Sequence, residues 1–553
     1  MNDELRALGE EYWEYRLSVT PTMALLLGDH RFDDRNEEYS RESEDRHIGR
    51  LRDFATRAET IDATDLTADE MISRDVLTYE ATSEAAVAES RVLELEASHT
   101  MGAQAMWPVT IGQIPVAEPE HAEAILDKYV GIGREFDERA DRLREGVSAG
   151  RTPMGSTAEK TVTQLDAQLS LAVEDDPFVA KLAMPDAWGA TETAAFRERL
   201  AAVVLVHLRP AIARFRDTIA DDVLPVARPD DRPGLRWLAD GEETYSRAIL
   251  RHTTMAMDPR EIHEIGLQQI ARLADPYREL GSEVLGTSDL SEIFTGLRED
   301  DDLHFKDGPA IVRASEQAMA KARAAMGDWF GRLPEAPCVV EETATGATAF
   351  YQTPSLDGSR PGTFYVNTAE PSRWSTFEIE AMAYHEGIPG HHLQLTIAQE
   401  LEGVPQFRQH ANVTAYAEGW GLYTERLADE MGLYGGPLDR IGMLEADSTR
   451  AGRLVVDTGL HTLGWSRQKA IDFFAENSPM TMTTIEGEVD RYIAWPGQAL
   501  AYMIGRLEIM RMRAEARTTM GDRFDIKAFH DTVLGSGLVP LETLDRMIRE
   551  WAS

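Results

Sequence analysis

The chain has 553 residues, of which 43% are hydrophobic and 27% charged, a composition typical of a globular protein and not of a disordered one. Its formal net charge of −40 argues against a nucleic-acid partner, whose phosphates require a basic surface, and against an anionic membrane. The single cysteine, Cys338, excludes an intrachain disulfide framework and a cysteine-rich metal site.

The first residues carry acids among their apolar side chains, unlike the basic and then apolar design of a signal peptide. No run approaches the roughly 18 consecutive apolar residues that spanning a bilayer requires. We therefore expect a soluble cytoplasmic protein, monomeric or homodimeric, with neither a nucleic-acid nor a membrane partner.

Helical periodicity dominates the first part of the chain. Helices are predicted over residues 3–18, 49–98, 120–148, 157–173, 189–220, 241–253, 259–285, 289–299 and 308–329. Asp258 and Pro259 predict the N-cap and first residue of one of them. Residues 100–119, which contain Trp107-Pro108, are expected to be an irregular connection.

A change of composition suggests how the chain is divided. Residues 221–240 are rich in Pro, Asp and Arg, as lobe boundaries often are. The expected arrangement is an N-terminal helical lobe, residues 1–230, and a C-terminal catalytic lobe, residues 231–553, in one integrated two-lobed body.

Residues 338–368 differ from the rest, because β-branched and aromatic runs are separated there by Asp357-Gly358 and Pro361-Gly362. This pattern predicts an antiparallel hairpin with Gly362–Asn367 as its stronger strand. Helices then return over residues 374–387, 391–401, 411–431, 436–475, 481–490 and 496–517. The expected fold is mostly α, with a small β-hairpin or sheet just before the histidine cluster that follows.

That cluster places three of the chain's 14 histidines and a glutamate within a few residues: His385, Glu386, His391 and His392. Histidines and a carboxylate base at this density are typical of a hydrolytic zinc site. In the HExxH pattern the second histidine would stand where this chain has Pro389. Proline and the two neighbouring glycines must interrupt the helix, so periodicity does not decide between His391 and His392; we prefer His391.

A catalytic zinc site needs a third protein ligand and one open position for water. Glu418 is the best candidate, because it stands on an apolar helix face between Ala417 and Gly419. Glu425 lies one heptad later on the same face. It is expected to accept the free N–H of a ligand histidine.

Several motifs together resemble the bacterial family called domain of unknown function 885: LADGEETYSRAILRHTT, DGSRPGTFYVNT, HEGIPGHHLQ, AEGWGLYTE, RLVVDTGLHTLGWSR and RYIAWPGQALAYMIG. The likeness covers most of residues 230–520. It implies a mostly helical, metallopeptidase-like fold with poorly defined substrates. The order of motifs is also similar to that of helical zinc peptidases of the thimet-oligopeptidase and angiotensin-converting-enzyme type, from which this chain departs by two extra residues before Gly390-His391.

Residue chemistry then suggests a mechanism. One zinc ion held by His385, His391 and Glu418 would lower the pKa of a bound water, and Glu386 would accept its proton. The oxyanion needs further donors, for which we propose His461 and Tyr502, with Tyr492 and His392 behind them.

Substrate contacts are predicted at two places. The strand Gly362–Asn367 could pair with an extended peptide, with Asn367 as a polar anchor. Arg453 and Arg491 could hold a substrate carboxylate, although an ion pair with Asp457 or Asp490 is the simpler interpretation.

These observations predict zinc-dependent hydrolysis of peptide bonds in short peptides. The resemblance favours a carboxypeptidase, dipeptidase or oligopeptidase. Two alternatives stay open: a zinc amidohydrolase or esterase that acts on a non-peptide substrate, and a helical scaffold with a degenerate metal site. Manganese or cobalt could replace zinc.

Overall fold

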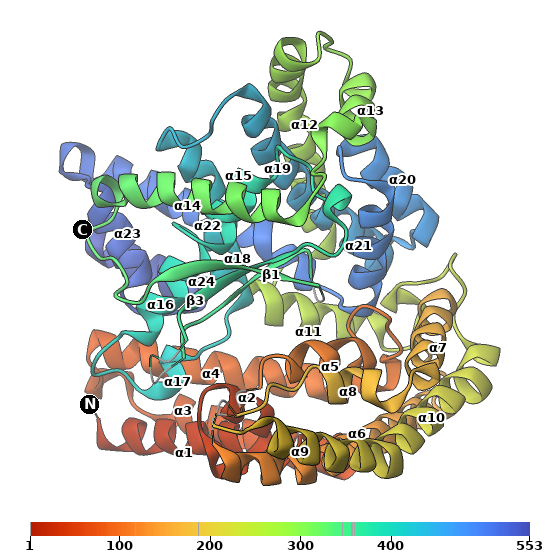
Figure 1. Cartoon of the computed structure of the whole chain (residues 1–553). Helices are drawn as coiled ribbons and strands as arrows, with labels where there is room; N and C mark the ends of the chain where they lie inside the picture. Colours follow the sequence, from red (N-terminus) through yellow and green to blue (C-terminus); the bar gives the residue numbers. More distant parts are fainter. Residues whose placement is uncertain are drawn as a thin grey trace.

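The computed structural model describes residues 2–114, 116, 118–185, 187–344, 347–355, 358 and 360–553. Most of these residues are helical, and one small β-sheet lies among the helices (Figure 1). The predicted mostly α fold is therefore confirmed. No helix in the described part of the chain is both long enough and apolar enough to span a bilayer.

Ten helices occupy the first part of the described chain. They are α1 (Asp3–Val19), α2 (Pro21–Leu26), α3 (Arg41–Thr60), α4 (Ala68–Glu89), α5 (Ala103–Ile111), α6 (Pro119–Ser148), α7 (Gly155–Ser170), α8 (Pro177–Ala180), α9 (Ala190–Val203) and α10 (Arg209–Asp217). The helices α11 (Gly241–Thr253), α12 (Pro259–Val284), α13 (Leu290–Glu299) and α14 (Gly308–Trp329) precede the sheet.

The helices after the sheet carry the histidine cluster and the segments that follow it. They are α15 (Ile379–Glu386), α16 (His391–Gln399), α17 (Gln406–Gln409), α18 (Thr414–Glu430), α19 (Pro437–Thr458), α20 (Arg467–Asn477), α21 (Met482–Ala494), α22 (Ala501–Met520), α23 (Ile526–Leu534) and α24 (Leu541–Ala552).

Local signals explain where several helices begin. The Asp258 side chain accepts a hydrogen bond from the Arg260 N–H, and Pro259 is the first residue of α12, as predicted. The predicted helix over residues 49–98 is instead two helices, because Thr67 and Glu70 form a capping box that starts α4.

One predicted connection is wrong. Residues 103–111 form α5, with Pro108 inside the helix. Trp107 and Ile111 are buried in the core on one side of this short helix. Burial of these large side chains outweighs the local penalty of the proline.

The sheet differs from the predicted hairpin. Strands β1 (Cys338–Thr343), β2 (Ala349–Gln352) and β3 (Gly362–Asn367) lie in the order β1-β3-β2. As expected, β2 pairs with β3 antiparallel, but β1 also pairs with β3, in parallel, with Cys338 opposite Gly362. Among the described residues the sheet is therefore mixed and three-stranded. The predicted turn residue Asp357 lies outside the described residues.

The largest core cluster joins distant parts of the chain. It combines buried residues of α1, α3 and α4 with residues of α14 to α18, β1, β3 and the C-terminal helices. A separate cluster fills the space among α5 to α10. Since residues 5–85 share a core with the C-terminal half, the proposed division at residue 230 does not separate two independent cores; the two-lobed description stays a prediction.

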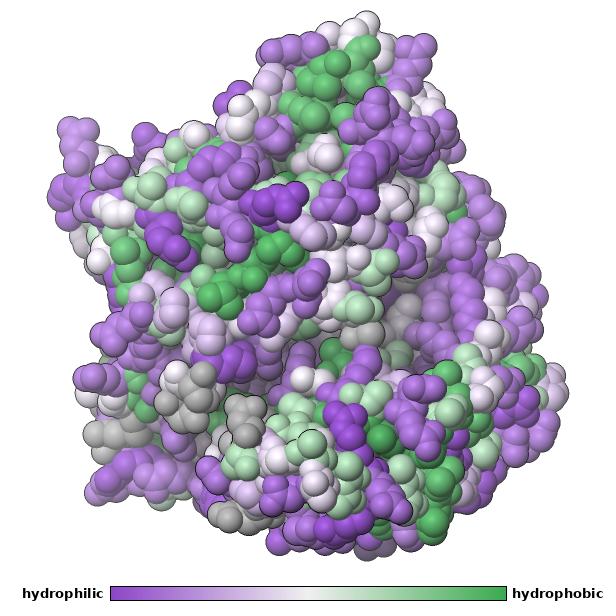
Figure 2. Space-filling view, in the orientation of Figure 1, coloured by the Kyte–Doolittle hydropathy of each residue, from purple (hydrophilic) through white to green (hydrophobic). Residues whose placement is uncertain are grey.

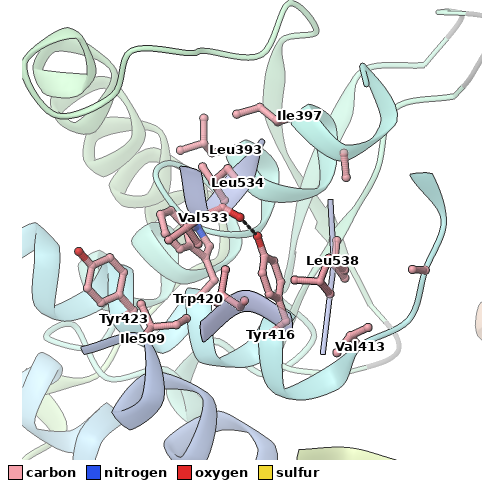
Figure 3. Close-up of a cluster of buried hydrophobic side chains, with 14 of the residues drawn as sticks. Leu393, Ile397, Val413, Tyr416, Trp420, Tyr423, Ile509, Val533, Leu534 and Leu538 are labelled. Carbon is pink, nitrogen blue, oxygen red and sulfur yellow. Dashed lines mark hydrogen bonds between the residues drawn. The ribbon is translucent and has the colours of Figure 1, made fainter. Parts of the chain in front are cut away.

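The core also holds α18 in place. Figure 3 shows Tyr416, Trp420 and Tyr423 of α18 packed with residues of α16 and α23. The Tyr416 hydroxyl donates a hydrogen bond to the Val533 carbonyl, and the Trp420 indole N–H donates to the Pro389 carbonyl at 3.0 Å. These contacts fix α18 against the turn between α15 and α16. The visible surface is mostly hydrophilic, as the high charge predicts (Figure 2).

Candidate metal centre

The histidine cluster lies where one helix ends and another begins. α15 ends at Glu386, and α16 begins at His391. Gly390 makes the turn possible, because a Cβ there would lie 1.8 Å from the His385 carbonyl oxygen. The restart brings the His385 and His391 rings together, with centroids 4.8 Å apart and planes at 87°. The predicted helix break is confirmed.

Glu418 reaches both of these rings from α18. Its Oε2 lies 3.4 Å from His385 Nε2 and 3.5 Å from His391 Nε2. One ligand atom from each of the three residues lies within 4.8 Å of the others. The structure therefore brings together the three side chains that the sequence predicts as metal ligands.

Glycines allow α18 to come this close. A Cβ on Gly421 would meet the His385 ring at 2.6 Å, and a Cβ on Gly419 would meet the Gly505 Cα at 2.5 Å. Gly421 therefore lets α18 lie directly against His385, and Gly419 lets it lie against α22. Larger residues at either position would push Glu418 away from the histidines.

The donor set fits a zinc ion. Ligand atoms about 2.0–2.1 Å from a tetrahedral zinc lie about 3.4 Å from one another. The two distances from Glu418 match this separation. Two imidazole nitrogens and one carboxylate oxygen are also a set of ligands found in catalytic zinc sites, which keep one position open.

Glu425 orients one of the histidines. The His385 Nδ1 donates a hydrogen bond of 2.7 Å to Glu425 Oε1. This bond places the proton on Nδ1, so the lone pair of Nε2 points toward Glu418 and His391. His385 is 2% exposed and Glu425 1%, so water does not compete for the bond. The arrangement agrees with the predicted role of Glu425.

The pKa values of the side chains at this centre are strongly shifted. Burial opposes protonation of His385, but the neighbouring Glu418 and Glu425 carboxylates outweigh it and raise the pKa of the ring to about 9. Burial would raise the pKa of Glu418, yet the hydrogen bonds and charges of His385 and His391 lower it well below its ordinary value. The two histidines and Glu418 therefore stabilise opposite charges on one another, and such strongly shifted pKa values are found at functional sites.

Two further predicted residues lie beside this centre. Glu386 is the last residue of α15; it is half-buried, and its carboxylate makes no hydrogen bond or ion pair within the described part of the chain. Tyr502 lies in the first turn of α22, and its ring stacks on that of His385 with centroids 6.2 Å apart. Burial and the Glu418 charge raise the pKa of the Tyr502 hydroxyl, which keeps it protonated and able to donate.

A basic cluster also contacts Tyr502. The Arg453 guanidinium lies 4.4 Å from the centre of the Tyr502 ring. Arg453 Nε donates to the Tyr492 hydroxyl, and its Nη2 donates to Glu488 Oε2, both at 2.8 Å. Arg453 Nη1 is buried and has no partner among the described residues.

Every side-chain nitrogen of Arg491 makes a hydrogen bond inside the protein. It binds Glu488 through Nε and Nη2, at 3.0 and 2.9 Å, and its Nη1 donates to Gln498 Oε1 at 2.7 Å. The predicted alternative partners, Asp457 and Asp490, are thus wrong for both arginines. Glu488, the observed partner, was not predicted, although it stands three residues before Arg491, a spacing that puts both on one helix face.

The His461 side chain is buried in the core, and its ring makes hydrogen bonds to the backbone. Its Nδ1 accepts from the Leu235 N–H at 3.1 Å, and its Nε2 donates to the Tyr492 carbonyl at 3.0 Å. Both ring nitrogens are therefore occupied, and burial lowers the pKa of the ring to about 3. The predicted role of His461 in stabilising an oxyanion is therefore wrong, because neither ring nitrogen is free to donate. His461 is a core residue that joins its own segment to those of Leu235 and Tyr492.

His392 also has a structural environment. Its Nδ1 hydrogen-bonds with the Tyr351 hydroxyl at 2.9 Å and lies 3.3 Å from Thr396 Oγ1. The residue is 1% exposed, and burial lowers the pKa of its ring to about 4. His391, and not His392, meets Glu418, which is the preference stated from the sequence.

The predicted substrate strand requires a correction. β3 is the central strand, paired with β1 on one edge and β2 on the other, so it has no free edge for a peptide. The Asn367 side chain accepts from the Ala369 N–H at 3.1 Å and so supports the turn after β3. Only β1 and β2 have edges that no described strand covers, and Tyr351 of β2 contacts α16 through His392.

The fold and the centre together define a helical protein with a site of two buried histidines and a half-buried glutamate. The model of the family "Bacterial protein of unknown function (DUF885)" matches residues 21–548. The chain therefore belongs to this family, as the motifs indicate. Among curated proteins, no sequence matches the chain.

Two solved structures share this fold. A protein described as a putative lipoprotein from Colwellia psychrerythraea is similar with a TM-score of 0.90 and 24% identity, over 99% of this chain and 98% of that one. A putative lipoprotein of unknown function from Shewanella oneidensis is similar with a TM-score of 0.76 and 19% identity, over 99% of both chains. These descriptions contradict the prediction of a cytoplasmic protein, which is withdrawn.

Proposed function

We propose that this protein is a zinc-dependent hydrolase that cleaves peptide bonds in short peptides. The observation that carries the proposal is the position of Glu418 Oε2, 3.4 Å from His385 Nε2 and 3.5 Å from His391 Nε2. The hydrogen bond from His385 Nδ1 to Glu425 supports it, because it fixes the tautomer that a metal ligand needs.

His385, His391 and Glu418 would hold the ion. When bound, zinc supplies Lewis-acid polarisation of a carbonyl and lowers the pKa of a water to about 7. Glu386 follows a ligand directly in sequence, and its carboxylate is unpaired within the described part of the chain. It accepts the proton of the attacking water and delivers it to the leaving amine.

Tyr502 is a further polar group beside the centre. Its ring lies against His385, and its hydroxyl stays protonated because its pKa is raised. It donates a hydrogen bond to the oxyanion that forms when water adds to the peptide carbonyl. Tyr492 does not share this role, since its hydroxyl donates to Glu488 and accepts from Arg453.

The basic cluster favours a substrate with a carboxylate near the cleaved bond. Glu488 is the carboxylate that both Arg453 and Arg491 contact, so the cluster has an excess of positive charge in a strongly acidic protein. Each side-chain nitrogen of Arg491 already makes a hydrogen bond, whereas Arg453 Nη1 is without a partner among the described residues. A substrate carboxylate that enters beside Tyr502 would accept a hydrogen bond from Arg453 Nη1. This favours carboxypeptidase or dipeptidase action.

The test uses protein purified without a histidine tag, and it applies equally to a monomer and to a homodimer. Zinc-loaded protein is assayed against a panel of short peptides and of N-acyl amino acids, beside the Glu386→Gln variant. Cleavage of peptides by the wild type and not by the variant supports the proposal. Cleavage of N-acyl amino acids alone would favour an amidohydrolase. No cleavage of either class by protein with a filled centre would contradict hydrolysis and favour a scaffold.

A further inference from the structure

A second group of potential metal ligands lies far from the centre described above. His30 begins a short 3-10 turn, His30–Phe32, and Asp33 follows it directly. His121 stands in the first turn of α6. The segments belong to the N-terminal helices near α2 and α6, whereas the candidate metal centre is built on α15, α16 and α18 (Figure 1).

The three side chains converge. One ligand atom from each of His30, Asp33 and His121 lies within 4.8 Å of the other two. His30 Nδ1 lies 2.8 Å from Asp33 Oδ2. The His30 and His121 rings stack face to face, with centroids 3.8 Å apart and planes at 10°. This packing brings two imidazoles and a carboxylate into one small volume.

Two atoms of this group lack a hydrogen-bond partner in the part of the chain that the structure describes. Asp33 is 3% exposed, and its Oδ1 is buried with no hydrogen-bond donor among the described residues. The Nδ1 of His121 is likewise buried and unpartnered among them. A buried polar atom without a partner is destabilising, because it has lost its hydrogen bonds to water. One cation would satisfy the carboxylate oxygen and the imidazole nitrogen together.

The surroundings attract cations. A cavity of about 480 Å³ opens beside the group, and His30, Asp33, Asp34, Glu123, Asp127 and Arg199 are among the residues that line it. Arg199 is already held by both oxygens of Glu123 at 2.6 Å. Lys128 is buried nearby and donates to the Arg35 carbonyl at 2.8 Å, so it does not neutralise Asp33 by direct contact. The cavity is therefore acidic, which raises the local concentration of cations.

We propose that His30, Asp33 and His121 form a second binding site, for a divalent transition-metal ion of the zinc type. Two imidazole nitrogens select such an ion over magnesium or calcium, which prefer all-oxygen sites. The His121 ring turns out of the stack to direct Nδ1 at the ion, and it loses no hydrogen bond because that nitrogen has no partner among the described residues. The bound ion would link the turn after α2 to the start of α6.

Zinc binding to the full-length protein tests this site independently of catalysis. Metal-free protein is dialysed against buffered zinc and its metal content is measured. We expect about two equivalents for the wild type, about one for His121→Ala or for His391→Ala, and none for the double variant. His207→Ala changes an exposed histidine and serves as the control, which should retain both equivalents.

Thermal unfolding gives a second measurement that does not depend on activity. In the His391→Ala background, added zinc should raise Tm, and this rise should disappear when His121→Ala or His30→Gln is added. Circular dichroism verifies that each variant is folded.

Two results would overturn the second site while leaving the proposed hydrolase intact. One is that both His121→Ala and His30→Gln bind as much zinc as the wild type. The other is that His391→Ala binds no zinc at all. If His121→Ala loses one equivalent of zinc and keeps the other, the second site is supported even if the protein cleaves no peptide.

Discussion

His385 Nδ1 and Glu425 Oε1 are joined by a buried hydrogen bond of 2.7 Å, on the side of the imidazole opposite to Glu418. The bond decides which nitrogen of His385 is free to bind an ion. We expect Glu425→Gln to lower zinc affinity at this centre by about 10- to 100-fold, because such outer partners orient and polarise the ligand. Competition with a chelator measures the change. Glu430→Gln, on the same helix but exposed, is the control; equal affinity in both variants would contradict the role of Glu425.

Glu386 should be separable from metal binding. Glu386→Gln keeps the size of the side chain but removes its basicity, so we expect full zinc content and a loss of about 10²- to 10⁴-fold in kcat. The exposed Glu402→Gln is the matched control and should leave kcat unchanged. Turnover at the wild-type rate by Glu386→Gln would show that another group accepts the proton.

The two adjacent histidines should behave differently. His391→Ala removes a nitrogen that faces Glu418 and should abolish zinc binding at this centre. His392→Ala removes the hydrogen bond to Tyr351 and should decrease the free energy of unfolding by about 1–3 kcal/mol, with zinc retained. Metal analysis and denaturant unfolding of both variants measure these effects. The reverse pattern would mean that His392 is the ligand.

Gly421 gives a steric test of the same geometry. A Cβ at this position would meet His385 Cε1 at 2.6 Å, so Gly421→Ala should displace the ring and weaken zinc binding. At Gly487, also in a helix, an added Cβ meets no described atom within 4 Å. Gly487→Ala should keep zinc and stabilise the protein by about 0.5–1 kcal/mol, as expected for alanine in a helix. Unchanged zinc affinity in Gly421→Ala would contradict the observed contact.

Tyr502 should act on the reaction and not on the metal. Tyr502→Phe removes one hydrogen-bond donor, and we expect kcat to fall by about 10²- to 10³-fold with KM and zinc content little changed. Tyr39→Phe, in the N-terminal part of the chain, is the control. A rise in KM alone would instead place Tyr502 in substrate binding.

Much of the fold follows from local sequence. Hydrophobic periodicity and caps such as Asp258-Pro259 predict most helices, and strand β3 has the predicted bounds Gly362–Asn367. The partners of β3 could not be predicted in this way. Parallel pairing with β1 depends on contacts between segments that are separated in sequence, for which no turn signal exists. α5 was missed because burial of its side chains outweighs the effect of Pro108.

The chemistry of the candidate centre can be read from the sequence: the types of residue, their order, and the interruption between Glu386 and His391 that glycine and proline impose. Which of these residues meet depends on how the helices pack. This packing turns His391 to Glu418 and His392 to Tyr351, and it occupies both nitrogens of His461 in the core. The physical reason is that side-chain type is local, whereas a site of a few ångströms depends on how separate helices pack. The same packing joins His30 and Asp33 to His121, which no spacing in the sequence relates.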